Sequence, residues 1–82
     1  MHSVEDVSLS DTYLSHVSTR IIRMFELYSR TINPQDSDFQ TYIRGYVSRK
    51  DPRNPESIPY SELYGIIKEG IREYIHKTQK KD

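Results

Sequence analysis

Apolar residues that recur every three or four positions constrain this chain most, because that spacing keeps side chains on one face of an α-helix. Three such stripes occur, and proline-containing breaks separate them. Their members are Leu14, Val17, Ile21, Met24 and Tyr28, then Phe39, Tyr42, Ile43, Tyr46 and Val47, then Leu63, Ile66, Ile67, Ile71, Tyr74 and Ile75. The pattern predicts an all-α fold, a small bundle of three helices over about residues 10–30, 35–50 and 59–77.

Two polar breaks set the limits of the predicted helices. Asn33-Pro34 ends the first helix, since the residue before a proline disfavours the helical conformation. Either Asn33 or Ser37 can cap the second helix. The second break, residues 51–57, holds two prolines beside turn-forming Asp and Asn.

The predicted domain organisation is simple. Residues 1–9 form a flexible acidic arm, residues 10–77 form a single helical domain, and residues 78–82 form a charged tail. One position of the third stripe is Gly70, although glycine inside a helix costs about 1 kcal/mol relative to alanine. Two explanations of Gly70 are open: close approach of another helix or an aromatic ring, or a tolerated defect.

Length and composition favour association. A chain of 82 residues has a small core, and without cysteine no disulfide can strengthen it. Seven Tyr and two Phe are a large aromatic load for such a core, and aromatic rings with a polar tip suit interfaces. We therefore predict a homodimer. The candidate interface residues are Ile22, Phe25, Tyr60, Tyr64 and Tyr74.

The charge balance argues against a general nucleic-acid binder, because 12 Lys and Arg face 12 Asp and Glu. The charge is unevenly distributed, however: residues 1–19 carry −3, residues 20–53 carry +3 and residues 54–82 carry zero. A local basic patch is therefore the alternative prediction, and its candidate nucleic-acid contacts are Arg20, Arg23, Arg44, Arg49, Lys50 and Arg53.

No motif in the sequence carries catalytic chemistry. His2, His16 and His76 fit no metal-ligand spacing, no serine lies in a Gly-x-Ser-x-Gly elbow, and no glycine-rich loop can cradle a phosphate. We accordingly expect no enzyme activity, no metal and no cofactor.

The remaining expectations concern location and role. The N-terminus lacks the features of a signal peptide, and no apolar run is long enough to cross a bilayer, which predicts a cytoplasmic protein without membrane contact. The predicted function is that of a small interaction or regulatory protein. It would act by contact with a second copy of itself or with another protein. The alternative is a DNA-associated transcriptional regulator.

Overall fold

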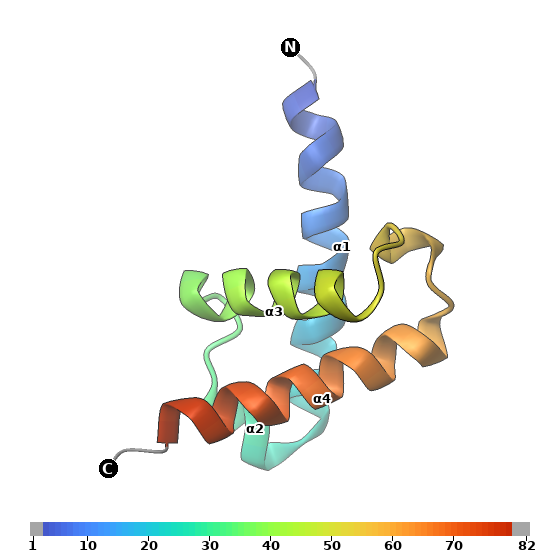
Figure 1. Cartoon of the computed structure of the whole chain (residues 1–82). Coiled ribbons are helices and arrows are strands. Elements are labelled where there is room, and N and C mark those ends of the chain that lie inside the picture. Colours follow the sequence, from blue (N-terminus) through green and yellow to red (C-terminus); the bar gives the residue numbers. More distant parts are fainter. Residues whose placement is uncertain (1–2, 80–82) are drawn as a thin grey trace.

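The chain folds into an all-α globule in a computed structural model that describes residues 3–79 (Figure 1). Three long helices and a short one follow each other in the chain: α1 (Ser3–Met24), α2 (Glu26–Thr31), α3 (Ser37–Lys50) and α4 (Tyr60–Gln79). A 3₁₀ turn, η1 (Pro55–Ser57), lies in the loop before α4. The predicted all-α class is thus confirmed.

The first predicted helix is divided at Phe25, which the apolar stripe did not indicate. Phe25 has extended backbone angles (φ −123°, ψ 120°) and separates α1 from α2. Its N–H still donates to the carbonyl of Ile22, at 3.3 Å. The break turns the chain so that Tyr28 and Ile32 reach the core from a new direction, and both are buried.

The helix ends also differ from the predicted ones. Helix α1 begins at Ser3, so residues 3–9 are helical where the sequence predicted an arm. Helix α3 begins at Ser37, because the side chain of Asp36, not that of Asn33 or Ser37, accepts a capping bond from the N–H of Asp38 at 3.1 Å. Helix α4 continues to Gln79, and the rest of the predicted tail, residues 80–82, lies outside the described residues.

All four helices contribute to one core, and the largest contact joins α3 to α4. Its buried members are Leu14, Val17, Ile21, Ile22, Tyr28, Ile32, Phe39, Ile43, Val47, Ile58, Leu63, Ile67 and Ile71. Gly70 explains the close α3–α4 packing, because a Cβ there would lie 2.9 Å from Cδ2 of Tyr46. Of the two explanations for this glycine, close approach of a ring is therefore the correct one.

The two ends of α1 have different surroundings. Among the described side chains of α1, those buried in the core run from Leu14 to Ile22. The first turns of α1 extend past α3 and α4 to one end of the molecule, and α2 lies close to α4 near the other end (Figure 1). The first turns of α1 and the α2–α4 side of the fold therefore lie at opposite ends of the molecule (Figure 1).

Candidate interaction surface

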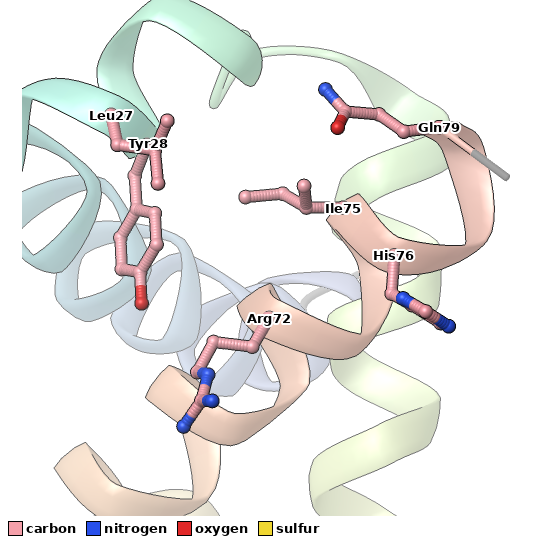
Figure 2. A pocket seen from close by; sticks show the side chains of 6 residues that line it. All are labelled: Leu27, Tyr28, Arg72, Ile75, His76 and Gln79. Atoms are coloured by element: carbon pink, nitrogen blue, oxygen red, sulfur yellow. The ribbon is translucent and has the colours of Figure 1, made fainter.

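A groove of about 510 Å³ lies between α2 and the C-terminal half of α4. Leu27 and Tyr28 line it from α2 (Figure 2). From α4, Ile75 points toward Tyr28, and the polar side chains of Arg72, His76 and Gln79 line the same side. We call this feature the α2–α4 groove.

Exposed apolar side chains lie on both sides of the break at Phe25, and one of them, Leu27, lines the groove. Leu27 is 66% exposed, and Met24, the last residue of α1, is 61% exposed. Tyr28 is buried and Ile75 is half-buried, so together they give the groove an apolar lining. Large apolar side chains exposed beside an apolar hollow are typical of a contact surface.

An aromatic strip continues from the groove toward the N-terminal end of α4. The rings of Phe25 and Tyr28 lie 5.1 Å apart, and the ammonium of Lys68 lies 4.8 Å from the centre of the Phe25 ring. The same ammonium is 6.0 Å from the Tyr64 ring, which lies 6.2 Å from that of Tyr60. Tyr60 is 46% exposed. The cation and the rings thus link the groove to the start of α4.

The structure divides the predicted interface residues into two groups. Phe25, Tyr60 and Tyr64 lie on the aromatic strip, where they are half-buried or exposed. Ile22 is completely buried, so its assignment to a contact surface was wrong.

Tyr74 also differs from the prediction, because it faces another helix of the same chain. Its ring lies 5.2 Å from that of Phe39 and 5.4 Å from that of Tyr42. Burial raises the pKa of Tyr74, and Asp36 and Asp38 add to that effect. Tyr74 therefore joins α3 to α4 within one copy.

Sequence reasoning missed Met24 and Leu27, the two most exposed large apolar side chains among residues 11–79, whose burial the structure describes. Met24 falls on the first apolar stripe, which made it a predicted core residue, and Leu27 was assigned to no surface. Leu27 does not belong to the first apolar stripe, and this isolated position was the sequence signal that could have indicated its exposure.

The predicted nucleic-acid contacts differ in their surroundings, and two of them lie beside carboxylates. Arg44 lies 3.8 Å from a carboxylate oxygen of Asp11. Arg53 bonds to Asp51 at 2.7 Å and to Glu62 at 3.0 Å, and hydrogen bonds from Arg53 lower the pKa of Asp51. These two arginines are thus already paired with carboxylates.

The other four cations lie in two different settings. Arg49 and Lys50 lie against the ring of Tyr46, 5.8 Å and 5.4 Å from its centre. Arg20 and Arg23 are exposed on α1, and among the described side chains they form no ion pair.

These features define the class of the protein: a small all-α protein with an apolar groove beside exposed apolar side chains. None of the helices within residues 3–79 has the length and hydrophobicity that a membrane crossing requires. Comparison of the chain with protein-family models, curated proteins and solved structures yields no match.

Proposed function

We propose that this protein is a non-enzymatic interaction or regulatory protein that acts by protein–protein contact as a homodimer. The observation that carries the proposal is the exposure of Leu27, which lines the α2–α4 groove, and of Met24 at the C-terminal end of α1. Covering these side chains removes apolar surface from water, which is the main favourable contribution to association. The small core supports the proposal, since oligomerisation is a common way to stabilise so short a chain.

The aromatic strip extends the proposed contact surface along α4. Tyr60 and Tyr64 offer apolar ring faces together with hydroxyl groups that hydrogen-bond at a polar rim. Lys68 lies on the same strip, near Phe25 and Tyr64. The proposed surface therefore has an apolar centre with polar and cationic edges.

Sedimentation equilibrium of the wild type and of a Leu27→Asp variant tests this proposal. We expect a wild-type dimer at micromolar concentration. Removing an exposed apolar anchor and adding a charge should weaken it about tenfold or more. Thr41→Asp is the matched control, because Thr41 is exposed on α3 and does not line the groove. A wild type that stays monomeric at several hundred micromolar would overturn the dimer.

The alternative function, a DNA-associated regulator, is supported by the exposed Arg20 and Arg23 on α1. Titration with duplex DNA at two salt concentrations tests it, because binding through phosphates weakens steeply as salt rises. Arg20→Ala/Arg23→Ala should then weaken binding and reduce the salt dependence. Absence of binding at low salt excludes this alternative.

A further inference from the structure

The outer side of α2 carries an apolar side chain between an acid and a base. Glu26, Leu27 and Arg30 are all exposed there. At 3.6 residues per turn these three positions fall within about 100° of one another around the helix axis, so they share one side. Tyr28 and Ile32 are buried in the core on the opposite side. This outer side therefore offers both signs of charge and an apolar centre.

The two charges lie one helical turn apart and are weakly held. Glu26 and Arg30 form an ion pair of 3.7 Å within α2, and their side chains stay 83% and 75% exposed. An ion pair between side chains this exposed contributes little to stability. Both side chains are therefore free to exchange partners with a second molecule at little cost.

The order of these charges distinguishes two ways in which a second copy of α2 can lie against the first. A twofold axis brings the same surface of both copies together. If the two helices were parallel, Glu26 would meet Glu26 and Arg30 would meet Arg30. If they are antiparallel, Glu26 of each copy meets Arg30 of the other. The outer side of α2 is therefore complementary to itself in the antiparallel arrangement only.

Leu27 supplies the apolar part of the same arrangement. It lines the α2–α4 groove together with Tyr28 and Ile75, and it is 66% exposed. A twofold axis that passes midway between residues 26 and 30 places Leu27 of each copy at the groove of the other. The exposed side chain and the apolar hollow then cover each other in both copies.

The α4 side of the groove favours an occupant without a large net charge. Arg72 and His76 line it, but Glu69 and Glu73 line a second hollow, of about 400 Å³, with the same two residues. Both signs of charge thus lie along this part of α4. A second α2, whose outer side carries one acid and one base, suits such a groove better than a strongly acidic or basic segment does.

We infer that two copies of this chain associate through α2 about a twofold axis, with the two α2 helices antiparallel. Leu27 of each copy enters the α2–α4 groove of the other, and Glu26 of each pairs with Arg30 of the other. The inference rests on the proposed homodimer and names the surface and orientation of its contact. Covering Leu27 supplies affinity, while the charges determine the orientation, because charge complementarity contributes more to specificity than to affinity.

Single charge reversals on α2 test this contact. Glu26→Arg and Arg30→Glu should each weaken the homodimer about fivefold or more at low salt, because each places like charges at both symmetry-related contacts. An equimolar mixture of the two variants should form a heterodimer of near wild-type affinity, since opposite charges then meet at both contacts. Sedimentation equilibrium measures these affinities. Glu56→Arg and Arg20→Glu are the matched controls, at exposed residues that do not line the groove, and far-UV circular dichroism confirms folding.

The charge-exchanged variant Glu26→Arg/Arg30→Glu separates antiparallel from parallel helices. Its own homodimer keeps opposite charges at both antiparallel contacts, so we expect an affinity near that of the wild type. Mixed with the wild type it should form little heterodimer, because like charges then meet at both contacts. Parallel helices predict the reverse preference. Native mass spectrometry of the mixture, with one chain isotope-labelled, measures the heterodimer fraction.

Nuclear Overhauser contacts between labelled and unlabelled wild-type chains locate Leu27 in the dimer. In an isotope-filtered spectrum we expect its methyl groups to contact the methyl groups of Ile75 in the other copy. Intermolecular contacts elsewhere without any from Leu27 would place the interface on another surface.

The outcomes separate this inference from the proposed function. A wild-type dimer whose affinity neither single reversal changes, or which mixes freely with the charge-exchanged variant, overturns the inference and leaves the homodimer in place. Intermolecular contacts that exclude Leu27 also overturn it. A monomeric wild type overturns both.

Discussion

Two glycines of α4 show how the same residue type serves different purposes at different positions. Gly70 is buried, and a Cβ there would lie 2.9 Å from Tyr46 and 3.1 Å from Ile43. Gly65 is exposed, and a Cβ there would meet nothing within 4 Å. Packing against α3 therefore requires glycine at the first position only.

Alanine substitutions at these two glycines should have opposite effects on the free energy of unfolding. Gly70→Ala should destabilise the protein by about 1–3 kcal/mol, because the new methyl group overpacks the α3–α4 contact. Gly65→Ala should stabilise it by about 0.5–1 kcal/mol, because alanine favours the helix. Urea denaturation measures both. Equal effects would contradict the packing role of Gly70.

Two tyrosines should make the fold sensitive to alkaline pH. Burial raises the pKa of Tyr46 and of Tyr74 in the folded chain above the ordinary tyrosine value. A raised folded pKa stabilises the fold below the unfolded pKa of about 10, and this contribution is lost as the pH rises through the folded pKa.

We expect the free energy of unfolding to fall as the pH rises above about 10. Tyr46→Phe/Tyr74→Phe should flatten that decrease, because phenylalanine does not ionise. Denaturation followed by circular dichroism between pH 8 and 12 measures it. Tyr60→Phe is the control, since Tyr60 is exposed. If the free energy of unfolding falls equally steeply with pH in the double variant, the attribution of this fall to Tyr46 and Tyr74 is contradicted.

At the scale of elements, local capping determines where α3 begins. Asp36 is the N-cap, and its carboxylate accepts the N–H of Asp38 at 3.1 Å. Asn33 caps no helix, and its side chain instead accepts the N–H of Gln35 at 3.0 Å. The loop thus uses one side chain for a turn and another for the helix start.

Asp36→Ala should lower the free energy of unfolding by about 0.5–2 kcal/mol, because it removes the cap of α3. Ser37→Ala should change it by less than about 0.5 kcal/mol, since Ser37 is an exposed helical residue without a capping bond. Thermal denaturation of the two variants compares the effects. A larger loss of unfolding free energy for Ser37→Ala than for Asp36→Ala would contradict the assignment of Asp36 as the cap.

At the scale of the whole molecule, the apolar residues are divided between the core and the proposed contact surface. The core takes Ile22 from the predicted interface, Tyr74 packs partly buried against that core, and Met24 and Leu27 on either side of Phe25 stay exposed. The proposed dimer would cover these exposed side chains, so its stability would be coupled to folding.

The thermal midpoint should therefore rise with protein concentration. Mass action stabilises the folded state of a chain that associates only when folded. Scanning calorimetry over a hundredfold concentration range should show this rise for the wild type. In Leu27→Asp, which weakens the dimer, the rise should be much smaller. A midpoint independent of concentration in the wild type would contradict association.

The sequence by itself determined the all-α class and most of the buried residues, because helical periodicity is a local property of the chain. It did not determine the break at Phe25 or the α3–α4 packing around Tyr74, because both depend on contacts between residues distant in the chain. The α2–α4 groove follows from those contacts. Periodicity identifies apolar side chains, and only the tertiary structure decides which of them remain at the surface.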